Sequence, residues 1–317
     1  MTYDFYFHND FDGRAAAAVM LAFLRTRGDE VQEFHPLDFE ITSRWPTMRF
    51  PRPAAVFDFL YHPRAAFWFD HHPTTFLRKS WERAFVPTKS HQLDPSARSC
   101  CSQVLRALER DFSFRPPRHL RELARWLDII DGAAYRSPQE SIDLQNPAIQ
   151  IMAYIDFFAR RKKPLARLIR FLSQHSLAEV ARLPELRKFL PRAQKWKREG
   201  IQYFKRNLQI VGRVAVINLA EREMPLDLRF FPYQLYPSLL AVLLRKGKGG
   251  KKLSLGFNPW KKTSWKNLNA AEIMRRYGGG GHPGAGGALA KNEQDAERIG
   301  REIVQLLNEQ FTAPHRA

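Results

Sequence analysis

The chain has few of the features that mark secreted or membrane proteins. Only two of its 317 residues are cysteine, the neighbours Cys100 and Cys101. Two adjacent thiols cannot supply a disulfide scaffold, so we expect buried packing for the pair and a cytoplasmic, reducing location for the protein. The longest early apolar run, residues 15–24, is about half as long as a membrane-spanning helix. It follows Asp10 and Asp12 instead of a basic leader, so a signal peptide and a membrane role are not predicted.

Acidic residues are scarce in the second half of the chain. The whole sequence has 51 Lys and Arg against 32 Asp and Glu, a net charge of +19. Residues 1–150 hold 19 basic and 19 acidic side chains, so the entire excess lies in residues 151–317. The densest stretch, residues 157–206, has 15 Lys and Arg against three Glu. Such a charge indicates a polyanionic partner such as nucleic acid, with a merely solvated helix face as the alternative.

Short apolar runs that alternate with helical segments predict an α/β fold with a parallel sheet in the first part of the chain. The expected strands and helices there are residues 3–8, 14–28, 31–37, 54–60, 65–69, 97–111 and 118–130. Residues 147–207 are helical and basic in pattern, without a convincing strand. A smaller α/β domain follows, with strands at 214–219, 239–244, 253–257 and 287–290, a hairpin turn at 245–252, and helices at 270–277 and 293–310. We therefore predict a catalytic domain (1–146), a helical connector (147–207) and a second α/β domain (208–317).

Carboxylates and imidazoles occur in the first domain wherever a strand or helix is expected to end. They are His8, Asp10, Asp12, Asp58, Asp70, His71, His72, Asp128 and Asp131. Ligands of open parallel sheets bind beyond the carboxyl ends of the strands, so these groups are expected to converge. Crowded carboxylates repel one another unless cations neutralise them. A mixed Asp/His set suits Mn²⁺ or a related divalent ion, and the scarcity of thiolates argues against structural zinc.

Each of these motifs also has a structural interpretation. The HNDFDG segment (residues 8–13) can form a turn that caps a helix, Asp58 can cap a loop, and Asp128 can be a surface residue of a helix. The occurrence of all four motifs in order, each at a predicted end, favours a metal site. Two ions about 3.5–4 Å apart would activate water and stabilise an in-line displacement at phosphorus.

The same motifs resemble those of the DHH phosphoesterase superfamily, in particular its DHH–DHHA1 branch. HNDFDGRAAA (8–17), VFDFL (56–60), FDHHP (69–73) and DIIDGA (128–133) are similar to its four DHH motifs, and GGGGHPGAGG (278–287) is similar to the DHHA1 signature. The branch includes RecJ-type exonucleases, nanoRNases that also act on pAp, and cyclic dinucleotide phosphodiesterases. The resemblance covers roughly residues 3–135 and 210–310.

The resemblance implies a DHH domain, a helical connector and a smaller DHHA1 domain, with the substrate in a cleft between the two domains. It also implies two metal ions. His8 and Asp10 would bind one ion and Asp12 the other, with Asp58 bridging both. His71 would complete the second site together with Asp131, which is preferred to Asp128 because Gly132 follows it. The resemblance assigns catalytic roles to Asp70, His71 and His72, of which Asp70 and His72 would orient ligands or contact the scissile phosphate.

In the DHHA1 domain, the resemblance implies that the glycine-rich loop presents backbone N–H groups to the substrate. The implied substrate-binding residues are Gly279, Gly280, Gly281, His282, Ser254, Asn258, Lys252 and Lys261. The arginine that many relatives use to grip phosphate is missing from the segment at 254–258, and the flanking lysines are the candidates to replace it.

We therefore predict a Mn²⁺-dependent phosphodiesterase, an exonuclease or oligonuclease, that acts on single-stranded or short nucleic acid; Mg²⁺ and Co²⁺ are alternative ions. Aromatic residues among the basic ones could stack bases or simply pack: Tyr203, Phe204, Trp260 and Trp265. The alternative functions are hydrolysis of a small substrate (a cyclic dinucleotide, pAp or polyphosphate) and non-catalytic nucleic-acid binding. RNA and DNA, and monomer and homodimer, are equally compatible with the sequence.

Overall fold

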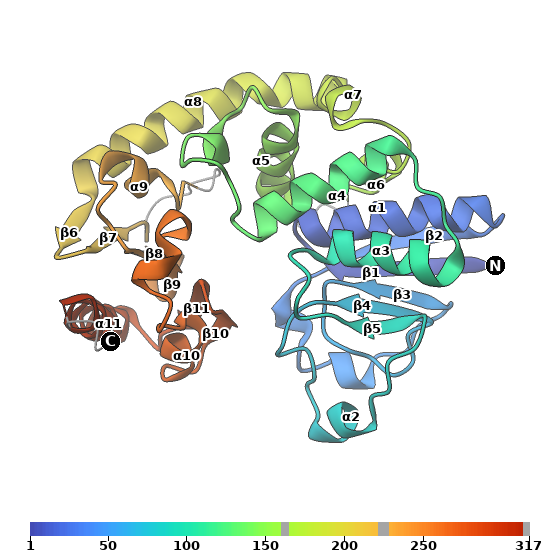
Figure 1. Ribbon diagram of the computed structural model, residues 1–317, viewed down its shortest axis with the longest axis horizontal. Coiled ribbons are helices and arrows are strands. Elements are labelled where there is room, and N and C mark those ends of the chain that lie inside the picture. Colours follow the sequence, from blue (N-terminus) through green and yellow to red (C-terminus); the bar gives the residue numbers. More distant parts are fainter. Residues whose placement is uncertain (160–164, 221–227, 313–317) are drawn as a thin grey trace. The chain divides into compact units, whose positions relative to one another are not determined.

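A computed structural model of the chain describes residues 1–159, 165–220 and 228–312. The chain divides into two compact units (Figure 1). Unit 1 comprises Met1–Ala134 and Leu144–Leu190, and unit 2 comprises Tyr135–Asp143 and Pro191–Ala317. Every helix in the described part of the chain is too short or too polar to cross a lipid bilayer.

Unit 1 is built on a five-stranded sheet in which every pair of neighbours is parallel, as predicted. The strands follow the spatial order β2-β1-β3-β4-β5. Their bounds are β1 Thr2–His8, β2 Glu30–Leu37, β3 Ala54–Phe57, β4 Phe67–Asp70 and β5 His91–Leu93. Because all five strands run in the same direction, their carboxyl ends lie along one edge of the sheet.

The helices α1 and α3 cover one face of this sheet (Figure 1). The side chain of Asp10 caps α1 by accepting a hydrogen bond from Gly13 N at 3.0 Å. Gly13 is required there, since a Cβ atom would lie 2.4 Å from the carbonyl oxygen of His8. The helices of unit 1 that lie wholly within it are α1 Phe11–Thr26, α2 Lys79–Ala84, α3 Cys100–Phe112, α4 Arg118–Asp131, α5 Pro147–Ala159, α6 Ala166–Leu172 and α7 Leu177–Ala181.

An aromatic cluster packs on the face of the sheet that carries Tyr6 and Trp68. Trp45 and Phe59 are its most deeply buried rings outside the sheet. The segment between β2 and β3 contributes to this cluster through two short 3₁₀ helices, η1 Phe39–Ile41 and η2 Trp45–Thr47. Both faces of the sheet are therefore covered, which is the condition that lets apolar parallel strands form.

The predicted helical stretch 147–207 consists, where it is described, of α5, α6, α7 and α8 Pro184–Asn207. The helix α8 begins in unit 1 and ends in unit 2. Most of its lysines and arginines are exposed. Within the basic stretch at 157–206, the four consecutive basic residues 160–163 lie outside the described residues.

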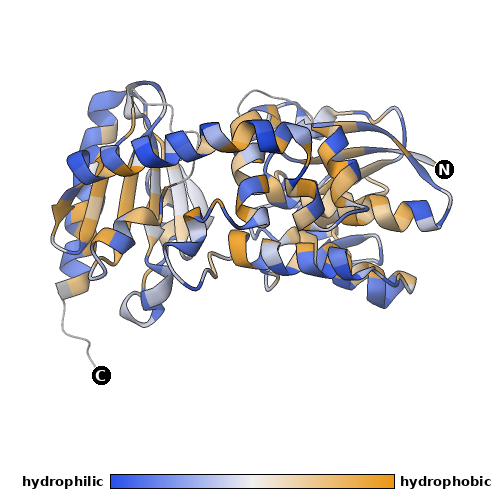
Figure 2. Ribbon diagram, turned by 90° about the horizontal axis from the view of Figure 1, so that it is seen from above, coloured by the Kyte–Doolittle hydropathy of each residue, from blue (hydrophilic) through white to orange (hydrophobic). Residues whose placement is uncertain are grey.

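Unit 2 contains a six-stranded mixed sheet of spatial order β10-β11-β9-β8-β7-β6, in which only β7 and β8 are parallel neighbours. Its strands are largely hydrophobic near the centre of the sheet (Figure 2). They are β6 Gln209–Val211, β7 Val214–Asn218, β8 Ala241–Lys246, β9 Lys252–Phe257, β10 Gly280–His282 and β11 Ala285–Leu289. The remaining elements are α9 Phe231–Leu235, α10 Ala270–Arg275, α11 Glu293–Thr312 and the 3₁₀ helices η3 Glu140–Ile142, η4 Lys248–Gly250 and η5 Pro259–Ser264.

The core of unit 2 lies between this sheet and the helices α10 and α11. Ile299 and Ile303 of α11 belong to the same buried cluster as Leu243 and Leu255 of the central strands. The helix predicted at 293–310 is therefore amphipathic because its apolar face packs on the sheet.

The structure differs from the predicted strands in three places. Strand β3 ends at Phe57 instead of residue 60, because Asp58 adopts a left-handed backbone with φ of 55°. The short strands β5 and β6 were not predicted. Three residues of the predicted glycine loop form the strand β10, which pairs with β11. A strand made of glycines carries no alternating side chains, so periodicity cannot reveal it.

We predict that Gly279→Ala destabilises the protein whereas Gly280→Ala does not. A Cβ atom at Gly279 would lie 2.0 Å from Gly287 O, while one at Gly280 would meet nothing within 4 Å. We expect a loss of about 1–3 kcal/mol in the free energy of unfolding for Gly279→Ala, the usual cost of overpacking. Chemical unfolding of the full chain measures it, with Gly280→Ala as the matched control. Equal stability of the two variants would contradict this packing.

Candidate active site

Seven acidic and imidazole side chains meet at the carboxyl edge of the five-stranded sheet. They come from the ends of β1, β3 and β4, from the first turn of α1 and from the last residue of α4. They are His8, Asp10, Asp12, Asp58, His71, His72 and Asp131. The parallel sheet thus brings together motifs that lie up to 123 positions apart in the sequence.

His8 ends β1 and faces two carboxylates. Its Nδ1 lies 2.8 Å from Asp10 Oδ2 and 3.4 Å from Asp58 Oδ2. Burial alone would lower the pKa of His8, but the carboxylates of Asp10 and Asp58 raise it well above its usual value. This imidazole therefore lies in a strongly negative field.

Asp12 is held by the beginning of α3. Its two oxygens accept hydrogen bonds from the backbone N–H groups of Cys100 and Cys101, at 2.6 and 2.9 Å. The side chain is almost fully buried. Burial raises the pKa of Asp12 well above its usual value, and the nearby carboxylates of Asp58 and Asp131 add to the shift. The cysteine pair thus contributes its backbone to the site, while both thiols are free and buried.

Asp58 occupies the centre of the group. Its Oδ1 is buried, accepts no regular hydrogen bond from the described residues, and lies 3.5 Å from both His71 Nε2 and His72 Nδ1. Despite burial, the imidazoles of His71 and His8 hold the pKa of Asp58 well below its usual range. Its left-handed backbone is sterically unfavourable for a residue with a Cβ, and such strain is found preferentially at functional sites.

Asp70 organises the two histidines that follow it. Its Oδ1 accepts hydrogen bonds from His71 N at 2.8 Å and from His72 N at 3.3 Å, and lies 2.8 Å from His72 Nδ1. Since a carboxylate only accepts, Nδ1 of His72 carries the hydrogen. Asp70 therefore acts on the site by orienting its neighbours.

The ring of His71 is oriented in the same way by a backbone carbonyl. Its Nδ1 lies 3.1 Å from Ala97 O and must donate to it, so Nε2 is directed at the carboxylates. Nε2 lies 3.4 Å from Asp131 Oδ2, 3.5 Å from Asp58 Oδ1 and 3.8 Å from Asp12 Oδ2. Although burial opposes protonation, Asp58 and Asp12 raise the pKa of His71 to about 11. Without a metal ion, an imidazolium supplies the compensating positive charge.

The structure distinguishes the two aspartates at the end of α4. Asp131 lies in the cluster, whereas Asp128 Oδ1 accepts a hydrogen bond from Ser99 Oγ at 2.8 Å. Burial, together with the charges of Asp58 and Asp10, raises the pKa of Asp131 to about 7, although a third of its side chain is exposed. The geometry therefore agrees with the choice of Asp131 over Asp128.

The side chains form three overlapping groups that could each hold a metal ion. One comprises His8, Asp10 and Asp58, the next Asp12, His71 and Asp131, and the third Asp58, His71 and His72. The ligand atoms of each group lie within 4.8 Å of one another. The buried Oδ1 of Asp58 and the Nε2 of His71, whose Nδ1 faces Ala97 O, fit a hard or intermediate divalent cation.

A polar network beside the site was not predicted from the sequence. Arg14 is fully buried and donates to Asp10 O at 3.0 Å and to Asn9 Oδ1 at 2.5 Å. Asn9 Nδ2 in turn donates to Asp38 Oδ2 and Ala159 O, both at 3.1 Å. Burial lowers the pKa of Arg14 to about 10, while Asp10, Asp156 and Asp38 oppose this shift. The one sequence signal was an arginine in an otherwise apolar, alanine-rich helix.

In unit 2, part of the predicted substrate-binding set lies on adjacent strands. Ser254 of β9 pairs with Gly287 of β11, which pairs with Gly280 of β10. Gly281 and His282 continue β10, and Gly279 immediately precedes it. These residues therefore belong to one end of the sheet.

The other predicted residues of unit 2 lie elsewhere. Lys252 begins β9, whereas Lys261 belongs to η5, beyond the opposite end of that strand. Asn258 is buried, and its amide donates to Leu239 O at 2.7 Å while its oxygen accepts from Trp260 N. The contacts of Asn258 support a structural role, since they hold the turn after β9.

The aromatic residues proposed as stacking platforms are mostly engaged in packing. Phe204 is fully buried, and the ring of Trp265 stacks on Phe257 with centroids 5.0 Å apart. Trp260 Nε1 donates to Tyr135 O at 2.8 Å. These contacts favour packing over base stacking at these three positions.

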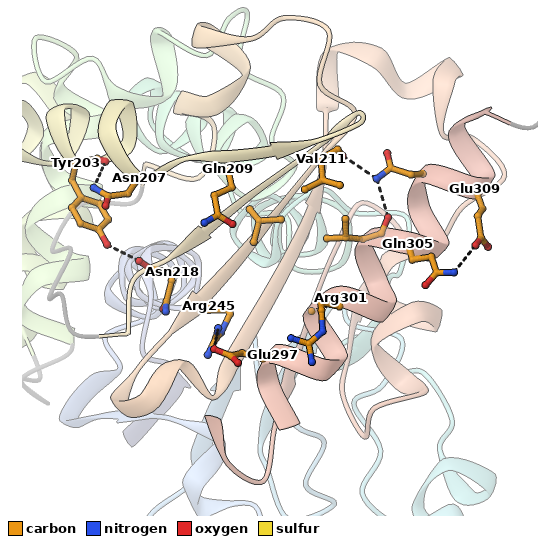
Figure 3. A pocket seen from close by; sticks show the side chains of 14 residues that line it. Tyr203, Asn207, Gln209, Val211, Asn218, Arg245, Glu297, Arg301, Gln305 and Glu309 are labelled. Carbon is orange, nitrogen blue, oxygen red and sulfur yellow. Dashed lines mark hydrogen bonds and ion pairs between the residues drawn. The ribbon is translucent and has the colours of Figure 1, made fainter. Parts of the chain in front are cut away.

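A groove of about 1050 Å³ lies in unit 2 between the end of α8, the strands β6–β8 and α11 (Figure 3). Arg245 lines it and donates to Glu297 Oε1 at 3.1 Å. Tyr203 also lines the groove and donates its hydroxyl to Asn218 O at 2.7 Å. Apart from Tyr203, no residue that the sequence singled out for substrate lines this groove, so it is a separate feature of the unit.

No family model and no curated protein matches the sequence. Several solved structures do match the fold. A pGpG-specific phosphodiesterase, PggH from Vibrio cholerae, is 18% identical with a TM-score of 0.67, over 97% of this chain and 99% of the other. RecJ from Thermus thermophilus in complex with Mn²⁺ is 16% identical with a TM-score of 0.59; the match covers 99% of this chain and 53% of RecJ.

An exopolyphosphatase-related protein from Bacteroides fragilis is 12% identical with a TM-score of 0.54, over 98% of this chain and 93% of the other. All of these proteins are members of the DHH superfamily. The chain has the DHH fold. At these identities the likeness concerns the fold, and it confirms the resemblance that the sequence motifs indicate. The cluster described above lies at the sheet edge that carries the DHH motif.

We predict that the contribution of Asp131 to the stability of the metal-free protein decreases as the pH rises from about 4 to about 7. The pKa of Asp131 is about 7 in the folded state, against an ordinary value of 3.8 for an aspartate, so this residue binds more protons in the folded state in this range. Stability falls with rising pH wherever the folded state holds the additional proton. Asp131→Asn should reduce this slope in urea unfolding with a chelator present. The same slope in wild type and variant would refute the assignment.

Proposed function

We propose that the protein is a divalent-metal-dependent phosphodiesterase that hydrolyses single-stranded or short nucleic acid. The observation that carries this proposal is the convergence of four aspartates and three histidines at one sheet edge, with Asp58 buried among them. Buried carboxylates at this density require cations. Solved DHH enzymes that share the fold are described as a phosphodiesterase and an exonuclease, which supports the same chemistry.

We assign two ions, Mn²⁺ by preference, to two of the groups. His8, Asp10 and Asp58 would hold one ion, and Asp12, His71 and Asp131 the other, with Asp58 between them. Bound ions supply Lewis acidity, which activates water and neutralises charge on the phosphate. Asp70 keeps His72 oriented, and His72 exposes a third of its side chain, so it can contact the scissile phosphate. The RecJ structures contain Mn²⁺ or Mg²⁺, which supports the choice of ion.

Nucleic acid is the favoured substrate because of the charge. The excess of +19 lies in the second half of the sequence, and the exposed basic residues of α8 are part of it. Basic side chains bind phosphates without regard to sequence and make affinity dependent on salt. The domain division at residues 146 and 207 and the substrate role of Gly279–Gly281 and His282 remain part of this proposal.

We predict that Asp58→Asn abolishes both Mn²⁺ binding and hydrolysis. Loss of the shared carboxylate should reduce the rate on a labelled single-stranded oligonucleotide by about 100-fold or more, since even indirect partners of metal ligands contribute 10–100-fold. Mn²⁺ binding is measured separately by calorimetry. Asp128→Asn is the matched control, because this aspartate accepts a hydrogen bond from Ser99 Oγ outside the cluster and its replacement should leave both quantities nearly unchanged. A wild-type level of Mn²⁺ binding in Asp58→Asn would contradict the assignment of Asp58 as a metal ligand.

A linear dinucleotide is the second candidate substrate. The pGpG-specific enzyme matches this chain along almost the whole length of both proteins, whereas the chain spans about half of RecJ. A two-residue substrate needs few positive charges on the protein. The two candidate functions therefore predict opposite preferences for the length of the substrate.

We expect a twenty-residue RNA to be hydrolysed with a higher kcat/KM than a two-residue RNA of related sequence. The preference should shrink as salt is raised, because it arises from additional phosphate contacts. Initial rates for both substrates at low and high salt measure it. A clear preference for the dinucleotide at every salt concentration would favour the second candidate.

A further inference from the structure

An exposed aromatic ring lies beside the candidate metal ligands. Phe39 is the first residue of η1, and its side chain is 60% exposed. Its ring centroid is 5.4 Å from that of His8, whose Nδ1 is 2.8 Å from Asp10 Oδ2. The ring of Phe39 is therefore separated from the carboxylate of Asp10 by a single side chain, that of His8.

The inner side of this ring rests on a rigid base. Phe39 packs on Phe59 with centroids 5.4 Å apart, and buried Phe59 packs edge-on against Trp45 at 5.1 Å. Trp45 is in turn fixed by a hydrogen bond from its Nε1 to Tyr61 O at 3.1 Å. A ring supported in this way presents one fixed face to solvent.

The backbone that carries Phe39 is also tied to the site. Asp38 Oδ2 accepts a hydrogen bond from Asn9 Nδ2 at 3.1 Å, which joins the segment to the end of β1. Within the segment, Ile41 N donates to Asp38 O and Thr42 N donates to Phe39 O, both at 3.1 Å. The position of the ring relative to His8 is therefore set by the same network that contains Arg14.

Part of the candidate metal-ligand cluster is exposed to solvent. Asp10 exposes 38% of its side chain and His72 33%, whereas Asp58 exposes 2%. A substrate can thus reach the exposed ligands without rearrangement of the buried ones. Phe39 contacts His8, which is itself partly exposed, so the ring lies beside a solvent-accessible candidate ligand.

We propose that Phe39 is a specificity-determining residue on which a nucleobase of the substrate stacks, while the adjoining phosphodiester occupies the metal site. This inference rests on the proposed function and narrows its substrate class. Stacking on an aromatic face is available to every base, and a phenyl ring has no donor or acceptor with which to distinguish them. Phe39 therefore selects for the presence of a base and not for its identity, which disfavours polyphosphate as the natural substrate.

The test compares a dinucleotide with an abasic analogue of the same length, in Mn²⁺. Phe39→Ala should raise KM for the intact dinucleotide by about 5- to 150-fold, the range expected for loss of one base–aromatic stack. Its kcat should change little, and KM for the abasic analogue should stay constant. Phe39→Trp should restore KM, whereas Phe39→Leu, which keeps the apolar packing, should not. Val86→Ala is the matched control, since Val86 is another exposed apolar side chain of unit 1, with 73% exposure.

Two results would overturn the inference. If Phe39→Ala changes KM for neither substrate, or for both alike, the ring supports His8 or the fold and does not bind a base. If Phe39→Leu behaves like wild type, the side chain acts through packing. Failure of the proposed function gives a different result: the wild-type protein then hydrolyses neither the dinucleotide nor a longer oligonucleotide with Mn²⁺, Mg²⁺ or Co²⁺, and the role of Phe39 falls with it.

Discussion

Mutual repulsion among carboxylates at one sheet edge is the constraint on which the rest of unit 1 depends. The parallel strands bring Asp12, Asp58 and Asp131 around one imidazole, close enough to shift one another's pKa values. Such an arrangement is stable only with compensating positive charge, from protons or from metal ions. Both the raised pKa of His71 and the raised pKa of Asp131 result from this need for compensating positive charge. We therefore expect the site to release protons when metal cations bind to it.

Three local devices hold the charged groups in place against this repulsion. The first turn of α3 binds Asp12 through two backbone N–H groups, and the dipole of that helix favours a negative charge there. The carbonyl of Ala97 fixes the tautomer of His71, and Asp70 fixes the ring of His72. None of these devices uses a flexible side chain, so the geometry is established before any ligand arrives.

The sequence was sufficient to predict those features that depend on where the strands end and on the order of the motifs along the chain. Apolar runs placed β1, β3 and β4, and the charged residues that interrupt or follow them identified His8, Asp58 and His71 as members of one cluster. The sequence was not sufficient where a role depends on contacts between distant segments. Nothing local shows that Asn9 joins Asp38 to Arg14, that Asn258 is fully occupied by backbone partners, or that Gly280, Gly281 and His282 form a strand.

The left-handed backbone of Asp58 has an evolutionary consequence. At this position glycine has the conformation that the chain demands at no steric cost, so only the chemistry of the carboxylate favours an aspartate over a glycine. The preference of the backbone and the chemistry of the site therefore act in opposite directions on one residue. A descendant copy of this protein released from its chemical role would be expected to lose the aspartate early and keep the fold. Among such descendants, the identity of residue 58 would distinguish enzymes from binding proteins better than overall sequence similarity does.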